Sequence, residues 1–87
     1  MYYVYALKSK IRNYIYVGLT DNPVRRIHQH NSGYEKTTKP YLPYALILLE
    51  NYPTRLEARS REKYLKGGSG KKYLKSIKGE LPEFIGD

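Results

Sequence analysis

The stretch Tyr14–His30, with the sequence YIYVGLTDNPVRRIHQH, constrains the fold most, because it reads as a strand that runs directly into a helix. Its first four residues are aromatic or β-branched, which is typical of a strand. Gly18 ends that pattern and allows another group to approach the backbone. Asn22 and Pro23 then form a helix start, with Asn as N-cap and Pro at the first helical position.

The helix that follows carries a polar pair of its own. Arg26 and His30 are four residues apart and therefore share a helical face. Val24 and Ile27 lie on a different face, which is the one expected to be buried. Two polar groups held together beside a strand tyrosine, away from the apolar face, indicate a functional site.

The remaining chain supplies further strands and helices. We expect strands at Tyr2–Leu7, Tyr14–Leu19 and Tyr44–Leu49, and helices from Asn22 to about Asn31, from the cap Thr54 to about Lys66, and at Lys71–Lys78. The segment 34–43 is polar with two prolines and reads as a loop, and the glycines at 67–70 should end the second long helix. The order β-β-α-β-α-α predicts an α+β domain over residues 1–78, followed by an extended acidic tail over 79–87.

The first two strands are expected to form a hairpin with a definite register. A turn symmetric about Lys10 and Ile11 would set Leu7 opposite Tyr14, Tyr5 opposite Tyr16 and Tyr3 opposite Gly18. The core face would then carry Val4, Ala6, Ile15 and Val17. Tyr5 and Tyr16 would be direct neighbours on the other face, and a slip of one residue would destroy both results.

The composition narrows the class of protein. The sequence has no cysteine, which excludes disulfides and thiolate metal sites. It shows no signal-peptide pattern and no apolar run of transmembrane length, so we expect a cytoplasmic protein that does not associate with membranes. The formal net charge of +8 and the pI of about 9.7 favour a polyanionic partner, in particular nucleic acid.

Several basic and polar residues are candidates for contacts with that partner. Lysine and arginine heavily outnumber glutamate between residues 55 and 78, and the loop 34–43 is also basic. The predicted nucleic-acid contacts are Lys36, Thr37, Lys39, Arg61, Lys66 and Lys71, and Thr38 of the same loop could also contact phosphate. The alternative is an ordinary solvated surface, just as the eleven tyrosines fit half-buried strands as well as base stacking.

Five side chains form a combination that suits phosphodiester hydrolysis: Tyr5, Tyr16, Arg26, His30 and Glu62. That reaction needs a general base, a cation against the developing phosphorane charge and commonly a metal ion. Glu62 shares a helical face with Ala58 and Leu65, so its carboxylate should turn inward, and Mg²⁺ needs few protein carboxylates. Taken singly, the tyrosines could be plain strand aromatics, Arg26 and His30 a solvated pair, and Glu62 a partner of Lys66.

The spacing of these residues resembles that of the GIY-YIG nuclease superfamily. The first motif reads Tyr3-Val4-Tyr5 and the second reads Tyr16-Val17-Gly18, and Arg26, His30 and the Arg61-Glu62 pair follow at the family's intervals. The resemblance covers roughly 2–75. It is greatest to the short stand-alone members of the excision-nuclease-like branch (the UvrC-type N-terminal domain), many of which share the segment Tyr64–Gly70. Tyr3 replaces the glycine of the first motif, and no asparagine follows Asn51, unlike in homing-type members.

The resemblance implies a fold and an activity. The fold would be a three-stranded, mainly antiparallel sheet flanked by about three helices. The activity would be metal-dependent endonucleolytic cleavage of DNA, rather than RNA, with selectivity for structure or single strands and a role in DNA repair or processing. By analogy, Tyr5 or Tyr16 would be the base, Arg26 would stabilise the transition state, and His30 would assist proton transfer or hold the phosphate. Glu62 would bind one Mg²⁺ or Mn²⁺.

Two other interpretations stay open. The first is a nucleic-acid-binding module that keeps the fold but does not cut, motivated by the basic helices and the tyrosines. The second is a subunit that depends on a protein partner for its grip on the substrate.

Overall fold

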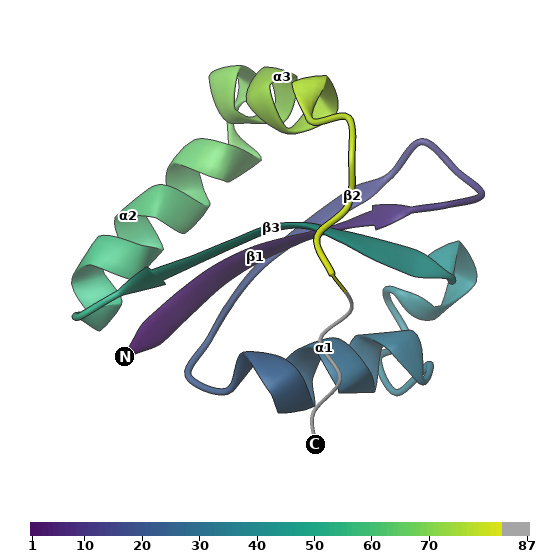
Figure 1. The fold of residues 1–87 in the computed structure, drawn as a ribbon, viewed down its shortest axis with the longest axis horizontal. Coiled ribbons are helices and arrows are strands. Elements are labelled where there is room, and N and C mark those ends of the chain that lie inside the picture. The colour runs from purple at the N-terminus through teal and green to yellow at the C-terminus, as the bar shows by residue number, and fades with distance from the viewer. Residues whose placement is uncertain (83–87) are drawn as a thin grey trace.

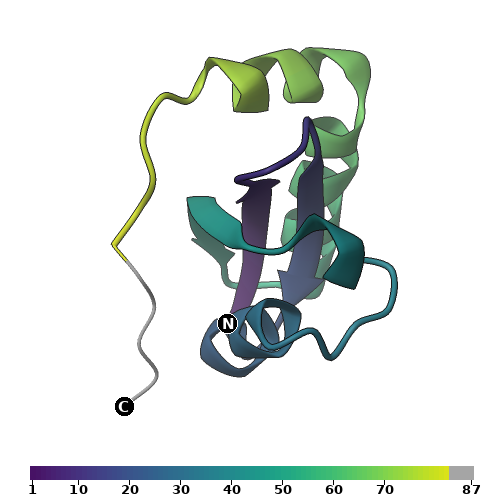
Figure 2. The same ribbon diagram turned by 90° about the vertical axis from the view of Figure 1, so that its right-hand side faces the viewer.

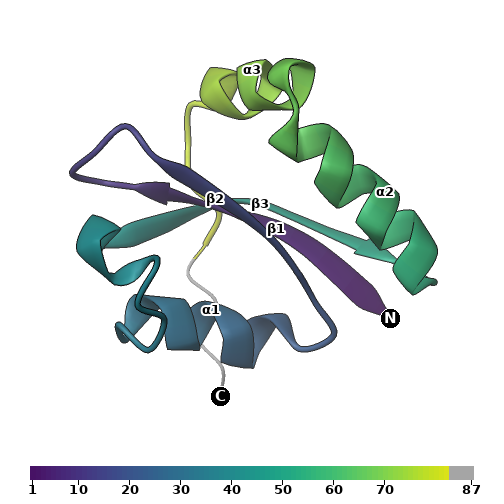
Figure 3. The same ribbon diagram turned by 180° about the vertical axis from the view of Figure 1, so that it is seen from behind.

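The centre of the molecule is a three-stranded antiparallel sheet, seen in a computed structural model that describes residues 1–82 of the 87-residue chain. Its strands are β1 (Tyr2–Ser9), β2 (Ile15–Thr20) and β3 (Tyr44–Tyr52), in the order β2-β1-β3. Helix α1 (Pro23–Asn31) covers one face, and α2 (Arg55–Lys66) and α3 (Gly68–Ser76) cover the other (Figure 1, Figure 3). The α+β fold expected from the sequence is confirmed.

The sheet separates two apolar cores, because successive side chains of a strand point to opposite faces. One core joins the strands to α2 and α3, and its buried residues are Val4, Ala6, Val17, Ile47, Leu48, Ala58, Leu65 and Leu74. The other lies on the side of α1 and comprises Tyr5, Leu7, Ile27, Tyr44 and Leu46. The predicted core face of the hairpin is therefore correct, and the tyrosines of the two motifs lie on the side of α1.

The hairpin register differs from the predicted one by two residues. Tyr5 pairs with Gly18, Leu7 with Tyr16 and Tyr3 with Thr20. The shift arises at the turn, where β1 continues to Ser9 and its hydroxyl oxygen accepts hydrogen bonds from the backbone N–H groups of Ile11 and Arg12. Since a shift of two residues preserves the faces, Tyr5 and Tyr16 still share one side, but as diagonal neighbours rather than direct ones.

This register explains why a glycine occupies position 18. It lies directly opposite Tyr5, whose ring folds over it. A Cβ atom built on Gly18 would come within 2.5 Å of the Tyr5 hydroxyl oxygen and within 2.5 Å of its Cζ. Because Gly18 of the second motif has no side chain, it leaves room for the phenol ring of Tyr5 from the first motif.

The helices begin largely as the capping residues predict. The side chain of Asn22 accepts a hydrogen bond from the Arg25 N–H, and Thr54 accepts one from the Glu57 N–H. Helix α3, however, begins at Gly68 instead of Lys71, so the expectation of a glycine linker over 67–70 is wrong beyond Gly67. The buried Gly70 brings α3 onto the end of α2, where a Cβ atom would overlap the Tyr64 carbonyl oxygen.

Two segments outside the main elements also take defined positions. Within the loop 34–43, Lys39–Tyr41 form a 3₁₀ turn, η1. Residues 79–82 form neither helix nor strand, yet the Leu81 N–H donates to the Leu46 carbonyl, 2.8 Å away, so this part lies along β3 (Figure 2). The rest of the expected acidic tail, 83–87, lies outside the described residues. Over residues 1–82, no helix combines the length and apolar character that a membrane crossing requires.

Candidate active site

Three of the predicted site residues meet on the α1 side of the sheet. The ring centroids of Tyr5 and Tyr16 are 6.2 Å apart, and that of His30 is 5.9 Å from Tyr5 and 4.7 Å from Tyr16. The tyrosines come from β1 and β2, and the histidine comes from the last turn of α1. The strand-to-helix segment therefore brings one tyrosine and the histidine to the other tyrosine, as the sequence predicts.

His30 is fully buried and uses both ring nitrogens. Its Nε2 lies 2.9 Å from the Tyr5 hydroxyl, and its Nδ1 lies 3.1 Å from the Thr38 hydroxyl. The Thr38 hydroxyl donates to the Glu35 carbonyl, so it accepts from Nδ1–H. We infer from this contact that His30 carries its proton on Nδ1, so that Nε2 accepts the proton of Tyr5.

Burial favours the neutral form of both partners. Desolvation lowers the pKa of His30, with a smaller contribution from the positive charge of Arg26. Desolvation, followed by repulsion from Tyr16, raises the pKa of Tyr5 well above its ordinary value. The pair is therefore a neutral phenol that donates to a neutral imidazole near pH 7, and Tyr5 cannot ionise unless its proton has somewhere to go.

Arg26, the fourth member, lies at the margin of this cluster. Its guanidinium is close enough to favour the ionised form of Tyr5, which partly offsets the effect of burial on the pKa of that tyrosine. Its Nη1 donates to the carboxylate of Glu35 at 2.5 Å and to the side-chain oxygen of Gln29 at 3.1 Å. A phosphate would thus compete with Glu35 for Arg26.

The segment after α1 contributes one site residue that the sequence analysis missed, Glu35, and a second, Thr38, to which it gave a different role. Gly33, with φ of 77°, turns the chain back in the left-handed conformation that favours glycine. Glu35 then reaches Arg26, and Thr38, which is 0% exposed, reaches His30. The expectation that Thr38 contacts phosphate is therefore wrong, because its side chain is enclosed. The periodicity of helices and strands could not predict these contacts, because it is the path of the loop that brings Glu35 and Thr38 to α1.

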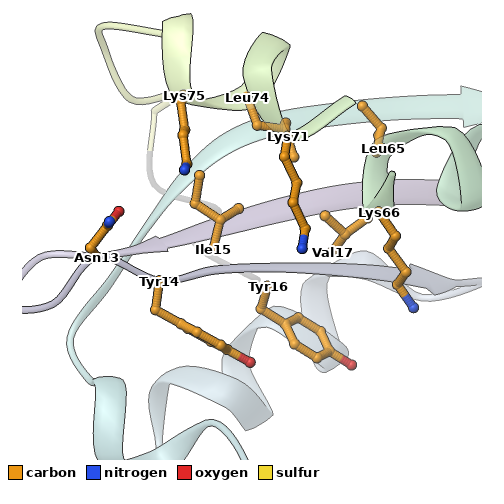
Figure 4. A pocket seen from close by; sticks show the side chains of 10 residues that line it. All are labelled: Asn13, Tyr14, Ile15, Tyr16, Val17, Leu65, Lys66, Lys71, Leu74 and Lys75. Carbon is orange, nitrogen blue, oxygen red and sulfur yellow. The ribbon is translucent and has the colours of Figure 1, made fainter. Parts of the chain in front are cut away.

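Glu62, the predicted metal ligand, lies in the helical layer on the opposite side of the sheet from α1. It lies on α2, its side chain is 12% exposed, and its carboxylate pairs with Arg59 at 3.7 Å and Lys66 at 3.1 Å. Among the described residues, no hydrogen bond or ion pair joins Glu62 to the tyrosine–histidine cluster. A link exists at the open edge of the sheet, where Lys66 and Tyr16 line one cavity of about 350 Å³ (Figure 4). Among residues 1–82 no group of three or more His, Asp or Glu side chains is arranged to hold a metal ion.

The predicted nucleic-acid contacts fall into three groups. Lys36, Thr37 and Lys39 are exposed on the loop after α1, and Lys66 and Lys71 line the cavity at β2. Arg61 has partners inside the molecule: its guanidinium donates to both carboxylate oxygens of Glu50, at 2.9 and 3.1 Å. It also lies over the rings of Tyr64 and Tyr73. A contact of Arg61 with nucleic acid stays a prediction.

The fold and the motif geometry define a class of protein. The family model of the GIY-YIG catalytic domain matches residues 1–75, so the chain belongs to the GIY-YIG family. Within it, the chain is 42% identical over 67 residues to a UPF0213 protein of Clostridium perfringens, an alignment that covers 76% of this chain and 71% of that protein. It is 39% identical over 77 residues to a UPF0213 protein of Staphylococcus haemolyticus, covering 87% and 93%.

Two further comparisons bear on fold and activity. The solution NMR structure of a UPF0213 protein from Bacillus halodurans superimposes with a TM-score of 0.54 at 35% identity, covering 91% of this chain and 87% of that one. The structure-specific endonuclease subunit SLX1 of Rattus norvegicus is 35% identical over 63 residues, which is 67% of this chain but only 23% of that protein. Membership of a nuclease family is thus shown.

Proposed function

We propose that this protein is an endonuclease that hydrolyses phosphodiester bonds in DNA at the site formed by Tyr5, Tyr16, Arg26 and His30. The observation that carries the proposal is the 2.9 Å hydrogen bond between the Tyr5 hydroxyl and His30 Nε2. It gives a tyrosine of raised pKa a proton acceptor inside a nuclease-family fold. Tyr16, half-buried on the edge strand, is the tyrosine on the solvent side.

The proton path follows from the assigned tautomer. As a water molecule attacks phosphorus, its proton passes to the Tyr5 oxygen while the Tyr5 proton passes to Nε2 of His30. The bond between phosphorus and the leaving oxygen breaks, and that oxygen departs with the bonding electrons and takes a proton from solvent. His30 is left as the imidazolium, with Nδ1–H held by Thr38. Arg26, drawn from Glu35 to the phosphate, neutralises the developing charge. In this assignment Tyr5 is the base and Tyr16 positions the substrate.

Within residues 1–82, Glu62 is the carboxylate that we assign to a divalent ion. Glu62 supplies oxygen donors, which Mg²⁺ and Mn²⁺ prefer, and Mg²⁺ commonly keeps several waters and binds few protein carboxylates. The carboxylate would have to release Lys66 and Arg59, whose positive charges occupy it now. When bound, such an ion supplies positive charge against the phosphate.

The proposed substrate is DNA with a branch or an unpaired strand, rather than a specific sequence. Most of the candidate contacts are lysines, and contacts between lysine and phosphate carry no base-specific information. The relative SLX1 is named a structure-specific endonuclease subunit, which supports this substrate class. Its being a subunit also supports a protein partner that supplies targeting. A role in DNA repair or processing in the cytoplasm completes the proposal.

The test is cleavage of single-stranded, duplex and branched DNA with Mg²⁺ or Mn²⁺. We expect Arg26→Ala and Glu62→Gln to lower the rate by about a hundredfold or more. Glu57→Gln, which removes an exposed carboxylate from the same helix, should leave the rate unchanged. Equal rates for Arg26→Ala and the parent would remove the catalytic assignment.

A second candidate is a binding module that keeps the fold and does not cut. The ion pairs of Glu62 with Arg59 and Lys66 favour it, because they occupy the only carboxylate proposed for the metal. DNA binding with a steep dependence on salt, and no product with either metal ion, would establish this reading instead.

A further inference from the structure

We propose that the groove between the outer edge of β2 and the helices α2 and α3 holds one unpaired nucleic-acid strand beside Tyr16. The inference rests on the proposed function and extends it by naming where the unpaired part of the substrate lies. The groove is the cavity of about 350 Å³ that Tyr16 shares with Lys66 (Figure 4).

The floor and rear wall of the groove are apolar. Ile15 and Val17 of β2 form the floor, and Leu65 and Leu74 form the wall behind it. A cavity of this size lies within the range of small-ligand pockets and accepts a base-sized group, whereas a duplex is far too wide. An apolar cavity of that kind suits the face of an unpaired base, because every base has an apolar π surface.

The rim of the groove is positively charged. Lys71 and Lys75, four residues apart on α3, extend toward β2 from above, and Lys66 adds a third ammonium group from α2 (Figure 4). No Asp or Glu is among the residues that line the groove, but Lys66 pairs with Glu62 at 3.1 Å, so Lys71 and Lys75 contribute most of the positive charge of the rim. The apolar floor and the cationic rim together suit a nucleic-acid single strand. One of its bases would enter the groove, and its phosphates would lie against the lysines.

The groove lies next to the candidate active site, because both include Tyr16. In Figure 4 the lysines lie on one side of β2, and the side chains of Tyr14 and Tyr16 extend to the other. β2 is an edge strand, so a nucleic-acid strand can pass over it without displacing a protein neighbour. A strand that binds the lysines would therefore reach Tyr16 as it crosses the edge. A second copy of this chain is a poor occupant, because it would set two basic grooves against each other.

The test measures binding in EDTA, without cleavage, with a fluorescent twelve-nucleotide thymidine strand and a duplex of equal length. We expect the variant Lys71→Gln/Lys75→Gln to bind the single strand at least about tenfold more weakly. Its slope of log affinity against log salt should fall by about 1.4, since each phosphate contact to a single strand contributes about 0.7. The matched variant Lys72→Gln/Lys78→Gln removes the same charge from exposed lysines that do not line the groove, and should bind nearly as the parent does.

A second probe separates bases from phosphates. The same strand with abasic sites throughout keeps every phosphate, and we expect it to bind about tenfold more weakly to the parent. Three results would each overturn the groove assignment. Binding could weaken equally in both lysine variants, or the abasic strand could bind as tightly as the intact one. The third is a dimer of the parent protein that dissociates in Lys71→Gln/Lys75→Gln. A protein that binds as described but never cleaves would overturn the proposed function and leave the groove intact.

Discussion

The hydroxyl oxygen of Tyr5 lies 2.9 Å from Nε2 of His30, within hydrogen-bond distance, and both side chains are enclosed, Tyr5 being 1% exposed and His30 0%. The bond joins a central strand to the end of α1 across 25 positions of the chain. Buried polar groups must find partners inside the protein, so this pair depends on a third group, Thr38, to complete the hydrogen bonding of the imidazole.

Thr38→Val should disturb His30 with little change of volume. The valine cannot accept the Nδ1 proton, so the imidazole loses the contact that fixes its tautomer. A positioned general base contributes about a hundredfold or more to a rate, and we expect the loss of its orienting contact to lower the rate of DNA cleavage by about tenfold to a hundredfold. The pH dependence of the rate should shift as well, because the imidazole loses a hydrogen bond on the nitrogen opposite Tyr5. Thr38→Ser keeps the hydroxyl and should restore both the rate and the profile. Nitrogen chemical shifts of the His30 ring offer a check that does not depend on activity.

His30 should also make stability depend on pH. Burial lowers its pKa in the folded state, while the unfolded chain takes up a proton near pH 6.5. Below that pH the unfolded state binds more protons, so the free energy of unfolding should fall as the pH drops from 7.5 to 5.5. Urea titrations at these two values would show a smaller fall in His30→Gln than in the parent. His28→Gln, which changes an exposed histidine of the same helix, is the control and should behave as the parent does.

Gly18→Ala should destabilise the protein through Tyr5. The new methyl group would lie 2.5 Å from the phenol oxygen, so the ring must move away from its place near His30. We expect a loss of about 1–3 kcal/mol in the free energy of unfolding, together with a loss of cleavage. Gly79→Ala, at a position with no atoms within 4 Å of a Cβ, should change neither. Wild-type stability in Gly18→Ala would contradict the close packing of the two motifs.

Gly70→Ala should loosen α3 from α2. The added Cβ would overlap the backbone of Tyr64 and Leu65, which cannot rotate away as a side chain can. We expect a loss of about 2 kcal/mol or more by thermal or urea unfolding. Gly68→Ala, in the same helix but with open space at its Cβ, should be neutral or stabilising by up to about 1 kcal/mol. Similar losses in both variants would indicate that helix propensity, rather than the contact between the helices, sets the effect.

Local sequence rules predicted the structure correctly where the contacts join residues that are close in the sequence. Asn22 and Thr54 cap helices as their spacing predicts, and the alternation around Val4 and Val17 assigns the core face. The rules failed where contacts join distant positions. The side chain of Ser9 set the register of the turn, and the packing of Gly70 on α2 moved the start of α3.

The candidate site divides in the same way. Period-two alternation puts Tyr5 and Tyr16 on one face, and the helical repeat puts Arg26 and His30 on another shared face. The residues that hold the second pair, Glu35 and Thr38, depend on how a turn at Gly33 closes, which no periodic pattern encodes. The catalytic and metal roles stay predictions, because they depend on a substrate and an ion.

The open edge of β2 carries a risk for the protein itself. A strand with unpaired backbone groups can recruit a strand of another molecule, which is how many sheets begin to aggregate. The ammonium groups of Lys71 and Lys75 beside that edge make such an approach costly, since burying them against polypeptide would remove them from water. The same lysines that we assign to DNA would therefore also protect the protein from self-association, so neutralising them should reduce its solubility.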